Sequence, residues 1–168
     1  MTSTPRLLDS AAWAVQLSAA IDAAKSTVHV LTFTVIATPQ SVDAADPDPY
    51  RAIENAARRG IEVRLIRSAT QHETLPATSG HAAAARLIYA GAQVRCLPPR
   101  PTLHAKAHCI DGQQLFVGSA NLSRSSIVSN TELGAKLDDP DDIAAFDELF
   151  RSLWVTAQPE PMPHPGGR

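Results

Sequence analysis

Residues 103–121, LHAKAHCIDGQQLFVGSAN, predict a β-hairpin at the centre of the fold. Asp111-Gly112 separates two apolar runs, and this dipeptide favours a tight turn because both of its residues tolerate positive φ angles. A two-residue turn pairs residues whose numbers sum to 223, which sets His104 opposite Ser119. A four-residue loop sets His104 opposite Asn121 instead.

Either register places four polar side chains on the same side of the hairpin, because side chains alternate between the two faces of a strand. These residues are His104, Lys106, Ser119 and Asn121. An ammonium group, a hydroxyl and an amide can bind phosphate oxygens, and an imidazole can attack phosphorus or carry a proton. Glu132, on a following strand, can accept a hydrogen bond from the second ring nitrogen of His104. The four residues therefore predict a phosphate site.

The chain before the hairpin predicts parallel strands joined by helices. Asp9 or Ser10 can cap a first helix, and Asp48-Pro49 begins a second helix that ends at Gly60. A third, alanine-rich helix ends at Gly91. Strands are expected at residues 28–36, 61–66 and 93–97, and this βαβαβ order is typical of a parallel sheet.

After Pro101 the expected strands are too close together for crossover helices: residues 103–110, 113–118 and 131–137. A last helix runs from Asp139-Pro140 to about Val155. The predicted fold class is α/β, with a mixed, mostly parallel β-sheet sandwiched between α-helices. We expect one domain over residues 10–156, after a lead of residues 1–9 and before a disordered tail, rich in proline and glycine, over residues 157–168.

Composition indicates a soluble globular domain, with 168 residues, 44% hydrophobic and 19% charged. No apolar stretch is long enough to span a membrane, and residues 1–6 do not resemble a signal peptide. We therefore expect a cytoplasmic protein without integral membrane contact. Cys96 and Cys109 are too few for a disulfide framework and are expected to be buried free thiols.

Charge is unevenly distributed along the chain. The formal net charge of −2 argues against a strong nucleic-acid binder. Residues 51–136 nevertheless carry 11 basic and 5 acidic residues, a net charge of +6, and the remainder carries 4 basic and 12 acidic residues. The middle of the chain can present a basic face to an anionic substrate, or these charges can be solvated faces of unrelated helices.

The order of motifs resembles the phospholipase D superfamily. His104-x-Lys106-x4-Asp111-Gly112, then Gly118-Ser119-x-Asn121 and Asn130-x-Glu132, is similar to its HKD motif. The resemblance extends over roughly residues 10–155 and includes an apolar first strand that ends in Thr32-Phe33-Thr34.

This resemblance implies a metal-independent phosphodiesterase without cofactors. Small members with a single motif form homodimers, in which one histidine attacks phosphorus and the partner's histidine protonates the leaving group. His104 is then the nucleophile and the acid, Glu132 orients its ring, and Lys106 and Asn121 hold the phosphate with Ser119 nearby. Asp111, Gly112 and Gly118 are implied to be structural.

No other histidine is expected to act as the second acid. His108 lies about 13 Å along the strand from His104, at about 3.3 Å per residue, so a shared zinc ion is not expected. We expect His108 at a rim or an interface, and His29 inside a core strand. His72 and His81 flank a loop, and His164 is in the tail.

Three functions are compatible with this sequence. The first is a nuclease that acts on DNA or RNA as a homodimer, with Arg100 and Arg124 as candidate contacts to the substrate's phosphates. The second is a phospholipase D-type lipid phosphodiesterase, which needs an apolar rim. The third is a non-catalytic module that binds phosphate or nucleic acid, although pure binding has no need of the imidazole.

Overall fold

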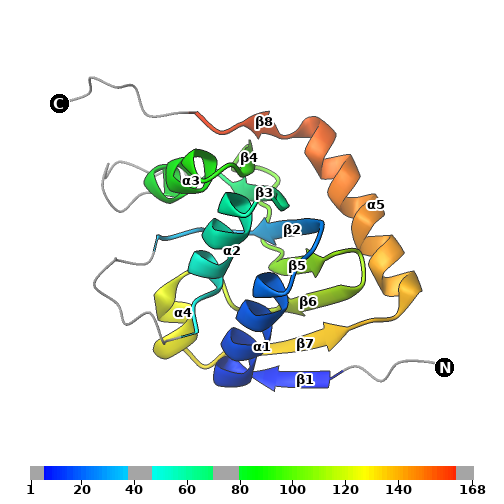
Figure 1. Ribbon diagram of the computed structural model, residues 1–168. Helices are drawn as coiled ribbons and strands as arrows, with labels where there is room; N and C mark the ends of the chain where they lie inside the picture. Colours follow the sequence, from blue (N-terminus) through cyan, green and yellow to red (C-terminus); the bar gives the residue numbers. More distant parts are fainter. Residues whose placement is uncertain (1–5, 38–46, 70–79, 162–168) are drawn as a thin grey trace.

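The computed structural model describes residues 6–37, 47–69 and 80–161, which form one eight-stranded sheet with helices on both faces (Figure 1). The strand order is β1-β7-β6-β5-β2-β3-β4-β8. The strands are β1 Arg6–Asp9, β2 Thr27–Thr32, β3 Glu62–Ser68, β4 Gln93–Leu97, β5 Ala107–Ile110, β6 Gln114–Gly118, β7 Leu133–Leu137 and β8 Gln158–Pro159. The helices are α1 Ser10–Asp22, α2 Pro49–Arg58, α3 Gly80–Tyr89, α4 Arg124–Val128 and α5 Pro140–Thr156.

The three helices whose N-terminal caps were predicted from the sequence, α1, α2 and α5, each begin after a capping aspartate. The carboxylate of Asp9 accepts a hydrogen bond of 2.8 Å from the backbone N–H of Ala12. Asp48 and Asp139 cap α2 and α5 in the same way, and each is followed by a proline, which has no N–H to satisfy in the first turn. These predicted helix starts are confirmed.

The sheet is mixed, but the prediction that it is mostly parallel is wrong. Only β2, β3 and β4 run parallel, and their pairings are the predicted βαβαβ unit. The other five pairings are antiparallel. After β4 no connection between neighbouring strands contains a crossover helix, which parallel neighbours need. Each following strand therefore pairs antiparallel with its neighbour.

The hairpin of β5 and β6 has a tight turn, but its predicted register is wrong by one residue. Asp111 and Gly112 both have positive φ angles, 54° and 61°, and Gln113 donates a 3.0 Å hydrogen bond to the carbonyl of Ile110. Gln113 is then left unpaired, so Ile110 pairs with Gln114. This extra residue acts as a β-bulge, and it shifts every pair after it.

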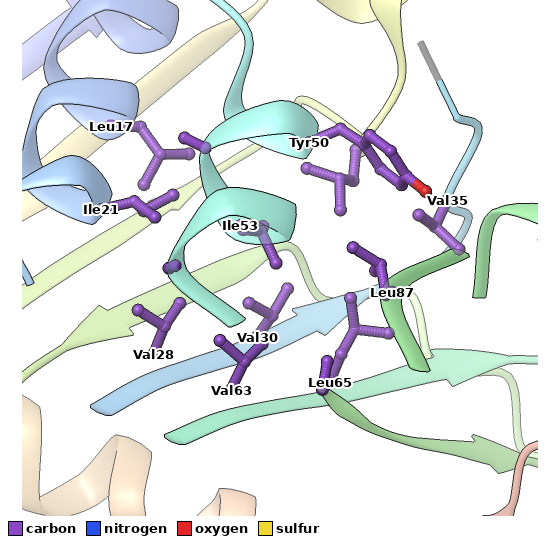
Figure 2. Close-up of a cluster of buried hydrophobic side chains, with 14 of the residues drawn as sticks. Leu17, Ile21, Val28, Val30, Val35, Tyr50, Ile53, Val63, Leu65 and Leu87 are labelled. Carbon is purple, nitrogen blue, oxygen red and sulfur yellow. The ribbon is translucent and has the colours of Figure 1, made fainter. Parts of the chain in front are cut away.

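Two apolar cores lie on opposite faces of the sheet. On one face, side chains of α1, α2 and α3 pack against β2 and β3. Figure 2 shows this core, with Leu17, Ile21, Ile53 and Leu87 above Val28, Val30, Val63 and Leu65. On the other face, α5 packs Ile143, Phe146 and Phe150 against Leu31, Ile66 and Cys109. Cys109 is a buried free thiol, as expected, whereas Cys96 is free but only partly buried.

The sheet extends beyond the predicted domain limits at both ends. β1 pairs with β7 at one edge and β8 pairs with β4 at the other edge (Figure 1). The described part of the predicted disordered tail is therefore ordered, and residues 162–168 lie outside the described residues. None of the described helices has both the length and the apolar composition needed to cross a bilayer.

Candidate active site

His104 and Lys106 lie side by side just before β5. The ammonium nitrogen of Lys106 lies 3.0 Å from Nε2 and 3.1 Å from Nδ1 of His104, and it donates a 2.8 Å hydrogen bond to the His104 carbonyl. His104 is exposed, whereas Lys106 is only 7% exposed. An imidazole that a ligand can reach therefore rests against a buried cation.

Phe33, just after β2, forms an aromatic wall for this pair. Its ring centroid lies 5.1 Å from that of His104, and the ammonium nitrogen of Lys106 lies 5.7 Å from the same centroid. A cation over an aromatic face is attracted by the ring's quadrupole, which favours the charged lysine. Phe33 is part of the family resemblance, but it was not predicted as a site residue. The sequence feature that could have identified it is an aromatic residue directly after a central strand.

Burial and charge act in opposite directions on Lys106. Removal from water lowers the pKa of Lys106 below its usual value, and the carboxylate of Glu132 partly offsets this effect. The lysine therefore loses hydration that an anion can replace. The electrostatic attraction between this ammonium group and a phosphate oxygen is therefore stronger than it would be in water.

Glu132 is held by hydrogen bonds from three side chains. Its carboxylate accepts from the hydroxyl of Ser119 and, at 3.0 Å, from the amide of Asn130. Burial alone raises the pKa of Glu132, but these bonds, one from Ser126 and the charge of Lys106 lower it overall. Glu132 is therefore a fixed carboxylate. Within the described residues it makes no hydrogen bond to His104 of the same chain.

The start of α1 positions the strand segment that carries Glu132. The hydroxyl of Ser10 accepts a 2.9 Å hydrogen bond from the backbone N–H of Glu132 and donates a 3.1 Å bond to the carbonyl of Asn130. One turn later, Trp13 packs against Gly134, where a Cβ atom would overlap the indole ring. Ser10 is predicted from the sequence only as a possible helix cap, and its contact with the segment of Glu132 joins residues that are 122 positions apart.

Asn121, three residues after β6, has an unsatisfied acceptor. Its side-chain Oδ1 is buried without a hydrogen-bond partner among the described residues. The two arginines proposed as phosphate contacts lie on different segments. Arg100 is exposed in the loop after β4, and Arg124 begins α4, directly after its cap Ser123.

Asp111 joins the hairpin turn to the loop between α1 and β2. Its carboxylate accepts hydrogen bonds of 2.8–2.9 Å from the backbone N–H groups of Lys25, Ser26 and Thr27. Burial alone raises the pKa of Asp111, but these bonds lower it to about 2.

The expectation that His108 lies at a rim or an interface is wrong. His108 is 1% exposed, lies edge-on to Trp13 at 5.9 Å, and has no hydrogen-bond partner among the described residues. Burial lowers the pKa of His108 to about 4. It points toward α1, whose Trp13 covers this face of β5. The predicted alignment of four side chains on one face fails because of the register. The backbone N–H of Gly118 donates to the carbonyl of Lys106, which sets these two residues opposite each other and gives Ser119 and Asn121 the other parity.

The other histidines lie away from His104. His29 is half-buried and stacks on Phe150 of α5, with a centroid distance of 4.6 Å. His81 contacts Glu160, and His72 and His164 lie outside the described residues. In the described ranges, no group of three histidine, cysteine or acidic side chains is close enough to hold a metal ion.

Comparison with known proteins gives a consistent family. The family model described as "Cardiolipin synthase, PLD-like domain" matches residues 17–154. The fold is similar to that in the crystal structure of Nuc, a phospholipase D family member from Salmonella typhimurium. That likeness has a TM-score of 0.75 at 20% identity and covers 93% of this chain and 98% of that one.

Two curated relatives are much longer proteins. The 5'-3' exonuclease PLD4 of Mus musculus is 27% identical over 150 residues, covering 83% of this chain and 29% of that protein. Cardiolipin synthase A of Proteus mirabilis is 31% identical over 127 residues, covering 73% of this chain and 26% of that protein. The chain therefore spans less than a third of either relative.

Proposed function

The chain belongs to the phospholipase D-like domain family, and from this premise we propose that it is a phosphodiesterase that cleaves nucleic acid. The observation that carries the proposal is the contact between exposed His104 and buried Lys106, with the ammonium group 3.0 Å from the ring. A nucleophile and an anion-binding cation then meet at one point on the surface. A phosphodiester fits both.

In the first step a ring nitrogen of His104 attacks phosphorus and forms an N–P bond, while the bond to the leaving oxygen breaks. Lys106 and Asn121 stabilise the negative charge on the phosphate oxygens, and Ser119 lies nearby. The side-chain NH2 group of Asn121 is the donor for this contact.

The leaving oxygen needs a proton on the side of phosphorus opposite to the nucleophile. No other histidine of the described residues lies beside His104, so this proton comes from His104 of a second copy. The same imidazole, now neutral, then takes a proton from water as the water oxygen attacks phosphorus. The N–P bond breaks, which frees the first His104 and releases the product. Glu132 orients an imidazole in this shared site.

The proposal needs no metal ion, because the ammonium and amide donors carry the charge of the transition state. The purified protein is therefore expected to cleave bis(p-nitrophenyl) phosphate in excess EDTA, and His104→Asn is expected to abolish turnover while the circular dichroism spectrum is retained. Loss of wild-type activity on chelation, or an active His104→Asn variant, refutes the mechanism. Lys136→Gln, which removes a lysine outside the site, is the matched control.

The choice of nucleic acid rests on the exonuclease relative and on the net charge of +6 over residues 51–136. The lipid alternative is favoured by the cardiolipin synthase relative and by an apolar groove of about 470 Å³ beside His104. Turnover of single-stranded DNA, duplex DNA, RNA and phosphatidyl lipids, compared without added metal, separates the two. A binding module, the third possibility, retains phosphodiesters without turning any of them over.

A further inference from the structure

The face of the sheet that α5 covers leaves an apolar ridge exposed beside the candidate active site. The ridge consists of Leu7, Val117, Leu133 and Ala135. Leu7 pairs with Ala135 and Ala135 with Val117, so these three side chains share one face, and Leu133 lies two residues before Ala135. Leu7 is 72% exposed and Leu133 is 61% exposed. Large apolar side chains grouped in this way mark an interaction surface.

An apolar groove opens on the same face, on the other side of His104. It lies between α5 and the loop after β4 and has a volume of about 470 Å³. Its walls include Pro101, Leu103, Leu149 and Leu153, and His104 itself lines it. In the strand order, β5 separates the ridge strands β6, β7 and β1 from the groove strand β4. His104, just before β5, therefore lies between ridge and groove.

We propose that the ridge of one copy seats in the groove of a second copy, with the two His104 side chains near the two-fold axis between them. This inference rests on the proposed function, which needs two imidazoles at one phosphorus atom. The two-fold axis of such a dimer lies in the plane of the interface. A surface on one side of the axis in one copy therefore faces the surface that lies on the opposite side of His104 in the partner. The ridge on one side of His104 then meets the partner's groove on the other side.

The chemistry of the two surfaces fits this occupant. Both surfaces are mainly apolar, although Thr102, His104 and Thr156 add polar atoms to the groove lining. Leu133 directly follows Glu132 in the chain, so docking of the ridge brings this carboxylate toward the partner's groove, which is lined by the partner's imidazole. The same contact buries the exposed apolar side chains and completes the site.

Two charge substitutions test this docking by sedimentation equilibrium. Leu133→Glu in the ridge and Leu149→Lys in the groove are each expected to weaken the dimer by at least about tenfold, because each buries a charge twice per dimer. Val155→Glu, on the same helix as Leu149 but outside the groove, changes an 80% exposed side chain and is expected to leave the dissociation constant unchanged.

A mixture of the two weakened variants gives a sharper test. In a heterodimer of Leu133→Glu with Leu149→Lys, one ridge–groove contact pairs glutamate with lysine and the other contact is wild type. The mixture is therefore expected to dimerise more tightly than either variant alone. Failure of the mixture to recover, or single variants that dimerise like the wild type, overturns the proposed surface.

The outcome also separates the surface from the proposed function. A wild-type dimer that is insensitive to both substitutions overturns only the surface, for example if copies pair along the outer edge of β1. A wild-type protein that is monomeric and active overturns the shared site as well. If Leu149→Lys lowers turnover of short-chain phosphatidyl substrates and leaves the dimer intact, the groove binds lipid and the docking proposal is wrong.

Discussion

Glu160 neutralises a buried arginine, so its removal is expected to destabilise the fold strongly. Arg67 of β3 is fully buried, and its guanidinium makes a bidentate contact with the Glu160 carboxylate at 2.7 and 2.9 Å. The side chain of Glu160 is also fully buried. The backbone N–H of Glu160 donates a 3.0 Å hydrogen bond to Val94, which fixes the chain after β8 against the sheet.

Glu160→Gln preserves the size of the side chain and removes its charge. The Arg67 guanidinium then loses the charge of this carboxylate inside the protein, and the removal of one partner from a buried ion pair costs about 3–5 kcal/mol. For a chain of this length, a loss at the lower end of that range lowers Tm by roughly 10 °C. His81, 2.5 Å from a Glu160 oxygen, cannot replace the lost negative charge. Urea unfolding at pH 7 measures the free energy directly.

The control for this prediction is Glu148→Gln, which removes an exposed acidic side chain of α5 and is expected to change stability by less than about 0.5 kcal/mol. The double variant Arg67→Met/Glu160→Gln also removes the buried positive charge and is expected to be more stable than Glu160→Gln alone. A loss below 1 kcal/mol for Glu160→Gln, or a double variant less stable than the single one, refutes the reasoning.

Three further predictions follow from buried groups around the site. Burial lowers the pKa of His108 to about 4, so between pH 6.5 and 4 only the unfolded state binds this proton. Stability is therefore complete above pH 6.5 and falls by about 3 kcal/mol toward pH 4 relative to His108→Leu, measured by urea unfolding across that range; parallel curves contradict it. The pKa of Asp111 is about 2, so its contribution is present above the unfolded pKa and is lost as pH falls toward 2. Asp111→Asn is expected to cost about 1 kcal/mol at pH 7, after allowance for its partial exposure, and a cost that persists at pH 2 argues against the charge. Gly134→Ala places a methyl group against Trp13 and is expected to cost about 1–3 kcal/mol with a shift in tryptophan fluorescence, whereas an unchanged spectrum and Tm contradict the close packing.

Local signals in the sequence predicted most of the elements before the hairpin. Aspartate caps and first-turn prolines are chemical requirements of helix ends, so Asp9, Asp48 and Asp139 identify their helices without tertiary information. The parallel order of β2, β3 and β4 follows from crossover helices in the same way.

Features that depend on tertiary pairing could not be read from local patterns. β1 and β8 are edge strands of four and two residues, too short to show an alternating pattern. The extra residue Gln113 depends on which neighbours the hairpin finds, and Asp111-Gly112 fits the observed register as well as the predicted one. The buried position of His108 depends on α1, which covers that face of β5, and the hairpin pattern carries no signal of this contact.

The candidate site also combines contacts that local sequence predicts with contacts that depend on the sheet order. His104 and Lys106 are two residues apart, and the sequence predicted their proximity correctly. Phe33 reaches them because β2 pairs with β5, and Ser10 reaches Glu132 because β1 pairs with β7, so both contacts depend on the sheet order. Such contacts between distant segments leave no local signal.

The central claim is that one phosphodiester site uses His104 from two chains. Subunit exchange between wild type and His104→Asn tests it, with a substrate from the panel whose leaving group is an alkoxide, because a nitrophenolate departs without an acid. If f is the fraction of wild-type chains, a shared site predicts that activity falls as the square of f. Activity that falls in proportion to f shows that each chain works alone and contradicts the claim.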